Sequence, residues 1–504
     1  MTRPLAAFLL GACLFTLAYA AQRLIAPFAG LGLTLYTAIA LTTLLGLALG
    51  CVLGTGTHAH GAQAGAAAAR ALFVAAALAL VTVVARRPLL EALHGQELRL
   101  TVTLAAALFA GLPAAAIGFA FAALQGGADA AGTVRAAAAL VAGAAVAAPL
   151  AGWLWVPHLG LSVTLVLVAV TETVVAALAG LRRAPVVTGA GVLVLLAASG
   201  FIATRPAAAA RIGPSMRVLR VGHEAEYRVF DRDGARHMLA DGTIHAVLDT
   251  LSGDCIQRGP AALALLQLMR PGRDSMLVFG LRGGALPLQF ARTGWRVRVV
   301  EPDSDAVEAS RPVAYKPGEL PLELMAPREF LRRDTGKHSV IVVDAFADAD
   351  LPYPLCTREF VGQMADHLLD DGMAAMIVET EGWKDPLLGA LTATLHTRFP
   401  HVLALPTSEP PNAMGTIILL AARQPFTFTD DQLPDPTTFF QNPSALWAEQ
   451  QLSHAWLNRF EPDTRGVAVL SDDRNGLVSV WADRQNHVAR AELHRYFGPT
   501  GGSW

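Results

Sequence analysis

Seven long apolar stretches occupy the first 204 residues of the chain. Each has close to the roughly 20 residues that an α-helix needs to cross the hydrocarbon core of a bilayer. Backbone polar groups in that core must be hydrogen-bonded internally, and runs of this length are typical of helices. The sequence therefore predicts a multi-pass α-helical membrane domain over residues 1–204. The expected spans are 4–21, 29–54, 69–86, 100–124, 135–156, 160–180 and 185–204.

The composition agrees with a membrane portion, because 53% of the residues are hydrophobic and 16% are charged. Residues 1–200 hold nine arginines and four acids, whereas the rest of the chain holds 30 basic and 37 acidic residues. The chain has no basic tail of the kind that would indicate a nucleic-acid partner. An outside N-terminus gives a weak excess of arginine on the cytoplasmic side. We expect an inner-membrane protein whose soluble part is cytoplasmic, where nucleotide-type cofactors are available.

One acidic residue, Glu172, lies in the middle of the predicted span 160–180. An ionisable side chain inside a membrane is costly to bury and is a functional candidate for that reason. The alternative is a structural acid that is hydrogen-bonded to a neighbouring helix, through Thr171 or Thr173 for example. Both interpretations are open at this point.

After the last apolar stretch, residues 205–258 are predicted to form a linker and a small antiparallel sheet. Short alternating runs between 216 and 249 are separated by Asp233-Gly234 and Asp241-Gly242, which are hairpin-turn signals. A helix is expected over 260–270, with a proline at its start.

Residues 259–424 alternate between apolar strands and helical patterns, which predicts an α/β domain with a mostly parallel sheet covered by helices on both faces. The expected strands are 275–280, 296–301, 320–325, 339–344, 372–379, 401–406 and 414–421. The expected helices are 284–293, 303–311, 327–333, 357–369 and 385–398. Residues 425–504 are predicted to be an extension packed on this domain, with helices at 444–460 and 477–496.

The first strand of this domain runs into a glycine turn, and a strand that ends in an acid follows one helix later. Gly280, Gly283 and Gly284 allow a tight turn and close approach of a ligand. Glu301, about twenty residues on, is placed to accept hydrogen bonds from ribose hydroxyls. The predicted cofactor site also includes Arg282 beside the glycines and Asp303 after Glu301.

Asp344 ends another predicted strand and should face the same edge of the sheet. A carboxylate there could accept a proton from an attacking amine or bind a cationic group, and the alternative is an acid that caps the next helix. Asp348 in the following loop and His245 on the small sheet are the candidate substrate-binding residues. We predict no metal site.

The motifs in their order resemble the polyamine aminopropyltransferases, or spermidine synthases, in their membrane-fused form. RDGARHMLADGTIHAVLDTLSG resembles the small N-terminal sheet of that family, and LVFGLRGGALP resembles its cofactor glycine loop. VVEPD resembles the ribose-binding segment, DAFADADLPYPLCTREF the catalytic loop, and VLSDDRNG a recurring C-terminal motif. The resemblance implies a Rossmann-like fold of the methyltransferase type for residues 259–424, and aminopropyl transfer from decarboxylated S-adenosylmethionine to an amine such as putrescine. It also implies that Glu301 binds the ribose and that Asp344 accepts the amine proton.

Three positions depart from the family pattern. Gly283 stands where the soluble synthases carry an aspartate that binds the cationic aminopropyl end, and Arg282 beside it adds positive charge. Ala326 stands where an aspartate usually contacts the adenine, and the tyrosine–histidine pair of the gating segment is absent from SGDCIQRGP.

These departures leave two alternatives open. One is an S-adenosylmethionine-dependent methyltransferase on the same fold, and the other is a non-catalytic, nucleoside-binding or transport-coupled membrane protein. The expected partners are a small amine and the lipid bilayer, with a homodimer as an open alternative to a monomer, but no nucleic acid.

Overall fold

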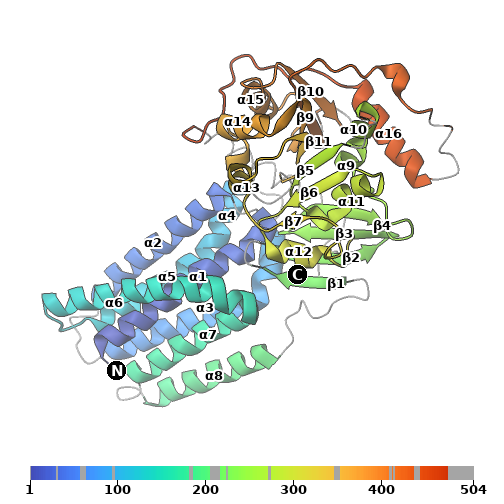
Figure 1. The fold of residues 1–504 in the computed structure, drawn as a ribbon. Coiled ribbons are helices and arrows are strands. Elements are labelled where there is room, and N and C mark those ends of the chain that lie inside the picture. The colour runs from blue at the N-terminus through green and yellow to red at the C-terminus, as the bar shows by residue number, and fades with distance from the viewer. Residues whose placement is uncertain are drawn as a thin grey trace. The chain divides into compact units, whose positions relative to one another are not determined.

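The computed structural model divides the chain into two compact units (Figure 1). One comprises Met1–Ile212 with His494–Trp504, and the other comprises Gly213–Leu493. The structure describes residues 2–29, 32–56, 64–93, 97–180, 185–204, 216–222, 225–270, 274–345, 352–407, 411–412, 415–435, 437 and 443–474.

The first unit is entirely helical within its described residues. Its α-helices are α1 (Arg3–Ala29), α2 (Leu33–Thr55), α3 (Ala64–Leu93), α4 (Leu98–Ala106), α5 (Leu112–Leu124), α6 (Ala130–Pro149), α7 (Val156–Gly180) and α8 (Pro185–Thr204). Short π-helical segments, η2 (Ala107–Gly111) and η3 (Leu150–Trp155), join α4 to α5 and α6 to α7.

Five continuous helical segments among the described residues are long and apolar enough to cross a bilayer. They are Arg3–Ala26, Leu33–Thr55, Ala64–Arg86, Leu98–Leu124 and Ala130–Gly180. The last of these holds two predicted spans, which Gly160 separates with a non-helical backbone (φ 78°, ψ 164°). The seventh predicted span corresponds to α8, whose shorter apolar part is Thr188–Phe201. A helical membrane domain is therefore confirmed, and the number of crossings stays a prediction.

Glycines allow close helix contacts in this unit. Gly46, Gly50 and Gly54 lie on one face of α2, against the backbone of η2 and α5. A Cβ atom at Gly50 would lie 2.0 Å from the carbonyl oxygen of Ala115. Small residues four apart allow helix backbones to approach this closely in a membrane, where van der Waals packing drives association.

The second unit begins with an antiparallel four-stranded sheet, as the sequence predicts. Its strands β1 (Met216–Val221), β2 (Glu226–Arg232), β3 (Ala235–Ala240) and β4 (Thr243–Asp249) pair in chain order. Asp233 and Gly234 have φ of 51° and 77°, and Asp241 and Gly242 have φ of 42° and 82°. Positive φ at both central residues is the geometry of a type I′ hairpin turn, which matches the twist of the strands.

The larger sheet has seven strands in the order β10-β11-β9-β8-β5-β6-β7. They are β5 (Ser275–Phe279), β6 (Arg296–Val300), β7 (Leu322–Glu323), β8 (His338–Val343), β9 (Leu368–Thr380), β10 (His401–Pro406) and β11 (Gly415–Ala422). β5 to β9 are parallel to one another, whereas β11 is antiparallel to both β9 and β10. This mixed sheet confirms the predicted methyltransferase-type Rossmann fold.

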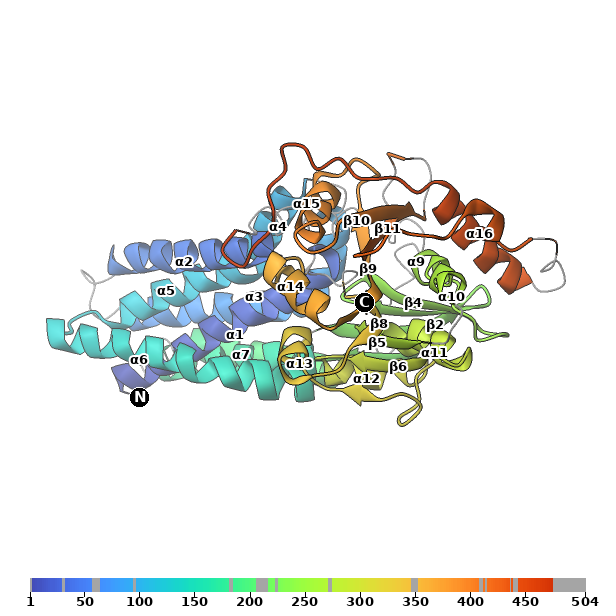
Figure 2. The ribbon, with the colours of Figure 1, turned by 45° about the horizontal axis from the view of Figure 1, so that its top comes forward.

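Helices cover both faces of the large sheet, as Figures 1 and 2 show. One face carries α13 (Pro327–Arg333), α14 (Arg358–Asp366) and α15 (Pro386–Leu395), with Phe279 and Phe360 in its core. The other carries α9 (Arg258–Ala262), α10 (Leu265–Met269), α11 (Ala285–Arg292) and α16 (Pro443–Leu457), with Phe290 and Trp456 in its core. α12 (Ser304–Ser310) packs instead against the small sheet.

One predicted helix is divided in the structure, and another lies outside the described residues. The expected helix over 260–270 is wrong as a single element, because α9 and α10 are separate. Between them the backbone hydrogen bonds change from the α spacing, Leu263 to Gly259, to the tighter spacing of Ala264 to Ala261. The helix expected over 477–496 lies outside the described residues.

Candidate functional site

The glycine turn after β5 brings the sheet edge close to other protein segments. Gly280 has φ of 103°, and a Cβ atom there would lie 2.4 Å from the carbonyl oxygen of Asp344. Gly284 has φ of 80°, and a Cβ atom there would lie 2.8 Å from Cβ of Tyr315. Both positions therefore require glycine because of their protein neighbours, independently of any ligand.

Gly283 is enclosed in the same way. Its φ is 74°, and a Cβ atom there would lie 2.7 Å from Cβ of Ala246 on β4 and 3.0 Å from Cγ1 of Val313. The Gly283 N–H donates to Oγ of Ser310 at 3.2 Å. An aspartate at this position, as in the soluble synthases, would force these segments apart. The departure at Gly283 is therefore built into the packing of the small sheet on the glycine turn.

The central feature of the site is an ion pair between two predicted site residues. Nη1 of Arg282 lies 2.5 Å from Oδ1 of Asp344, at the carboxyl end of β8. The Arg282 and Asp344 side chains are 6% and 3% exposed. Arg282 also donates from Nη2 to the Ile244 carbonyl at 2.7 Å, which ties β4 to the pair. The predicted catalytic acid thus has an internal cation as its partner.

The backbone of Arg282 is in a conformation that non-glycine residues seldom adopt, with φ of 39°. Such a conformation costs on the order of 1–3 kcal/mol and persists where the surroundings compensate for it. The compensation here is the buried ion pair with Asp344. The thiol of Cys255 is near this pair, and burial raises its pKa to about 12. Cys255 is therefore an uncharged neighbour of the pair rather than a nucleophile.

Glu301 joins the second strand to the glycine turn. Its Oε2 accepts from the Leu281 N–H at 2.9 Å, and its Oε1 accepts from the Asp303 N–H at 3.0 Å. The side chain is buried, with the residue 8% exposed. Glu301 therefore fixes the glycine turn relative to the end of β6.

Asp303 has a structural position in this arrangement. It is the N-cap of α12, where Oδ1 accepts from the Asp305 N–H at 2.8 Å and Oδ2 accepts from the Tyr227 hydroxyl at 2.6 Å. Burial raises the pKa of this carboxyl, although the bond from Tyr227 opposes the rise. Asp305 pairs with Arg220 of β1 at 2.5 Å. Together these contacts fasten the small sheet to α12.

The substrate-binding candidates His245 and Asp348, and the departure at Ala326, are the other predicted features of the site. His245 is buried on β4, and its ring lies edge-on to Tyr227 at 6.1 Å between centroids. Ala326 precedes α13 and provides no side-chain cap. Asp348 lies outside the described residues, so its role stays a prediction. No group of three or more metal-ligating side chains occurs among the residues that the structure describes.

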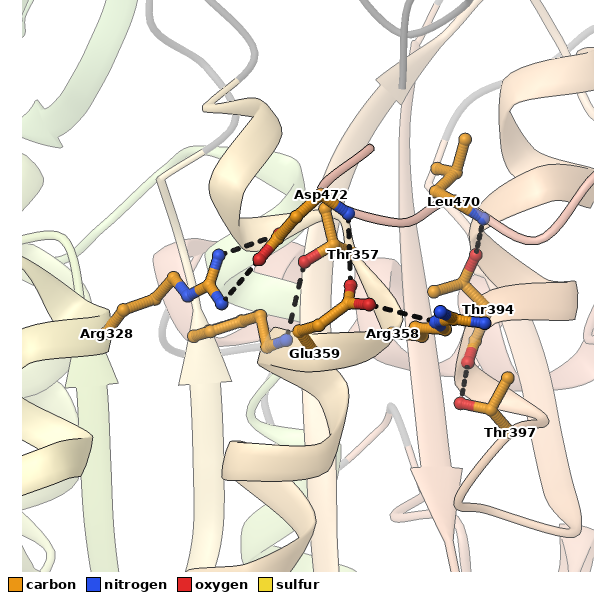
Figure 3. A network of polar contacts seen from close by, with 9 residues as sticks. Arg328, Thr357, Arg358, Glu359, Thr394, Thr397, Leu470 and Asp472 are labelled. Carbon is orange, nitrogen blue, oxygen red and sulfur yellow. Dashed lines mark hydrogen bonds and ion pairs between the residues drawn. The ribbon is translucent and has the colours of Figure 1, made fainter. Parts of the chain in front are cut away.

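The sequence analysis did not foresee which residues the C-terminal segment contacts on this domain. Asp472 forms two ion-pair contacts with Arg328 of α13, at 2.8 and 2.9 Å (Figure 3). Its N–H donates to Glu359 at 3.1 Å, and the Leu470 carbonyl accepts from the Arg358 N–H at 2.9 Å. The segment thus binds the N-terminal ends of α13 and α14, and the acidic pair after Ser471 was its signal.

No protein-family model matches the chain, and no curated protein sequence matches it. Several solved structures are similar to part of the chain. A probable spermidine synthase from Corynebacterium glutamicum is 16% identical with a TM-score of 0.42, over 51% of this chain and 97% of the other. The spermidine synthase from Thermotoga maritima is 14% identical with a TM-score of 0.35, over 44% and 77%. Human methyltransferase-like protein 13 in complex with SAH is 18% identical with a TM-score of 0.30, over 42% and 98%.

Proposed function

We propose that the second unit, Gly213–Leu493, called the soluble unit below, is a membrane-attached transferase. It binds an adenosyl-sulfonium donor of the S-adenosylmethionine type and transfers a group from that donor to an amine. The observation that carries this proposal is the meeting of Glu301, the glycine turn and Asp344 at the carboxyl ends of β5, β6 and β8. Ligands of open α/β sheets bind at this edge.

Each of these groups has a role that its chemistry supports. Glu301, at the end of the strand after the glycine turn, is the acceptor for the two ribose hydroxyls. The glycine turn lies beneath the sulfonium end of the donor. Asp344 faces the neutral acceptor amine, accepts a hydrogen bond from its N–H group and takes that proton as the nitrogen attacks.

Arg282 decides which donor the site prefers. A free carboxylate on the donor can bind the guanidinium and compete with Asp344 for it, since guanidinium groups hold carboxylates well in buried sites. Donor binding would then release Asp344 for the acceptor. We therefore propose that the donor keeps its carboxylate, as S-adenosylmethionine does. The amine nitrogen attacks the methyl carbon, the carbon–sulfur bond breaks onto sulfur, and the amine proton goes to Asp344.

The second candidate is aminopropyl transfer from decarboxylated S-adenosylmethionine to an amine, as in polyamine biosynthesis. The buried acid at the end of β8 favours it, because an amine proton would be accepted at that place. In this reaction the donor's ammonium group must displace the Arg282 guanidinium from Asp344. Gly283 and Arg282 both oppose the cationic donor, so we rank this reaction second.

Calorimetric titration of the full-length protein in detergent tests the proposal. We expect S-adenosylmethionine to bind more tightly than its decarboxylated form, and Glu301→Gln to weaken both. Arg282→Gln should weaken S-adenosylmethionine by about 10- to 100-fold, the value of a hydrogen bond between charged groups. Arg298→Gln on β6, whose guanidinium pairs with Glu323 and Asp334, is the matched control and should bind normally.

Two other outcomes of the titration would overturn the proposed reaction. Tighter binding of decarboxylated S-adenosylmethionine, with aminopropyl transfer in a product assay, would establish the second candidate. Absence of binding by either donor and by methylthioadenosine would contradict both reactions and favour a non-catalytic protein.

A further inference from the structure

Glu172 of α7 is the most unusual polar residue of the membrane unit. Its residue exposure is 0%, and neither carboxylate oxygen has a hydrogen-bond partner among the described residues. The two threonines beside it do not contact it through their hydroxyls. Oγ of Thr171 donates to Leu167 and Oγ of Thr173 donates to Ala169, both within α7. The hypothesis of a structural hydrogen bond through these threonines is therefore wrong.

Among the residues that the structure describes, no charged side chain forms a hydrogen bond or ion pair with Glu172. α7 packs against α1, α3 and α8. α1 carries two buried titratable side chains, Cys13 and, further along the helix, Arg23. On α3, Arg70 is exposed and its Nε donates to Ala66 of the same helix. α8 has no charged residue in Pro185–Thr204.

Buried threonine hydroxyls on the neighbouring helices α1 and α3 also have partners. Thr16 of α1 donates to Ala12, and Thr82 of α3 donates to Leu78, each within its own helix. The C-terminal end of α7 lies against the N-terminal part of α3, where a Cβ atom at Gly180 would be 2.8 Å from Cβ of Ala69. Glu172 is thus held two turns into the bundle, among small and apolar side chains.

A charged carboxylate cannot persist in such surroundings without compensation, because removing an ion from water costs many kcal/mol in an apolar medium. The neutral acid, with its proton, is the form that this arrangement accommodates. Ionisable residues in membrane helices typically serve ion or proton pathways, since a packing role alone is met better by an apolar residue. We propose that Glu172 is a proton-binding site of the membrane unit, separate from the site of the soluble unit.

The proposed step is a simple proton exchange. The O–H bond of the Glu172 acid breaks, the proton passes to water that enters the bundle, and the negative charge stays on the carboxylate. The reverse step restores the neutral acid. The ligand is therefore a proton, and the site would couple the membrane unit to a proton gradient.

Dicyclohexylcarbodiimide, an apolar reagent that adds to protonated carboxyl groups, tests this site in the full-length protein in lipid vesicles. We expect it to modify Glu172, as located by peptide mass spectrometry, and the rate of modification to fall as the pH rises. A water-soluble carbodiimide should instead modify Glu97, which is exposed at the N-terminus of α4. Infrared difference spectra between low and high pH should show loss of a protonated-carboxyl band, and Glu172→Gln should lack this change.

Two results would contradict the proposal. If the apolar reagent leaves Glu172 unmodified and the infrared band does not respond to pH in the wild-type protein, the residue does not exchange its proton and the proposal fails. Protection of Glu172 from the reagent by an alkylammonium ion would also overturn it, in favour of a site for organic cations. Because the infrared measurement uses the wild-type protein, instability of Glu172→Gln cannot obscure the answer.

Discussion

The two units each bury an acidic side chain, and the free-energy cost of burying a charge is avoided differently in each. Asp344, at 2% residue exposure, lies 2.5 Å from the guanidinium of Arg282. Glu172, at 0% exposure, has no hydrogen-bond partner among the described residues. One acid is neutralised by a neighbouring cation, and the other is accommodated as a neutral, protonated group.

This difference has consequences for how each acid can be perturbed. A paired buried acid tolerates changes in pH but not the loss of its partner, because the remaining charge is left without compensation. A lone buried acid tolerates neutral substitution, because an apolar side chain suits its surroundings better. Four substitutions or pH changes test this contrast, and for the ion pairs among them the expected effect on stability decreases as exposure to water increases.

The largest effect is expected for Arg282→Leu, which leaves Asp344 buried with its charge unpaired. We expect the free energy of unfolding of the soluble unit to fall by about 3–5 kcal/mol. Urea unfolding of the full-length protein in detergent, followed by hydrogen exchange in β5 and β8, measures it. The double substitution Arg282→Leu with Asp344→Leu should recover most of the loss. Equal losses in the single and double variants would show that the ion pair is not the cause.

The opposite sign is expected for Glu172→Leu in the membrane unit. Replacing a lone polar group with an apolar one should stabilise that unit by about 2–3 kcal/mol, the scale of the cost of an acid at the centre of a membrane helix. Unfolding in mixed micelles, followed by hydrogen exchange in α7, measures the change. Thr173→Val on the same helix controls for the polarity of the neighbouring position. A destabilised Glu172→Leu would mean that the carboxyl group has a partner after all.

A partly exposed pair in the small sheet gives a smaller and pH-dependent effect. The bond from Arg236 holds the pKa of Asp231 at about 2, against an ordinary value of 3.8, and Arg217 assists. A lowered folded pKa means that the stability is present above about pH 4 and is lost as the pH falls towards about 2.

We expect this loss to be about 1–2 kcal/mol after allowance for solvent screening, since the Asp231 side chain is 25% exposed. Hydrogen exchange in β1–β3 between these pH values reports it. Asp231→Asn should be less stable at neutral pH and should lack this acid transition. An unchanged transition in that variant would assign the acid sensitivity to other carboxyl groups.

Much of the fold could be predicted because it depends on local patterns. The apolar run lengths predict the helical membrane unit, and the alternation of strands and helices predicts the sheet to within a few residues at most strands. The turn chemistry of Asp233-Gly234 and Asp241-Gly242 predicts both hairpins. The error at 260–270 arose because a continuous apolar pattern does not reveal where backbone hydrogen bonds change their spacing.

The site was predictable in its backbone and less so in its side-chain partners. Glu301 and Asp344 follow from their places at strand ends, and Glu301 does bind the glycine turn. The pairing of Arg282 with Asp344 depends on a positive φ at a non-glycine residue, which no sequence pattern indicated. The bond from Tyr227 to Asp303 joins residues 76 positions apart, so it depends on how the small sheet packs on α12.

The smallest effect belongs to the exposed pair of Arg328 and Asp472, whose side chains are 23% and 43% exposed. Arg328→Gln should cost about 0.5 kcal/mol of global stability, because water and salt weaken such pairs. Locally, the C-terminal segment should exchange its amide hydrogens faster around Leu470 and Asp472, while the N-terminal half of the large sheet is unaffected. Arg465→Gln, whose guanidinium pairs with nearby Asp463, is a matched control that should leave this segment unchanged. A global loss as large as that of Arg282→Leu would contradict the dependence on burial, since pairing would then matter equally in water and in the core.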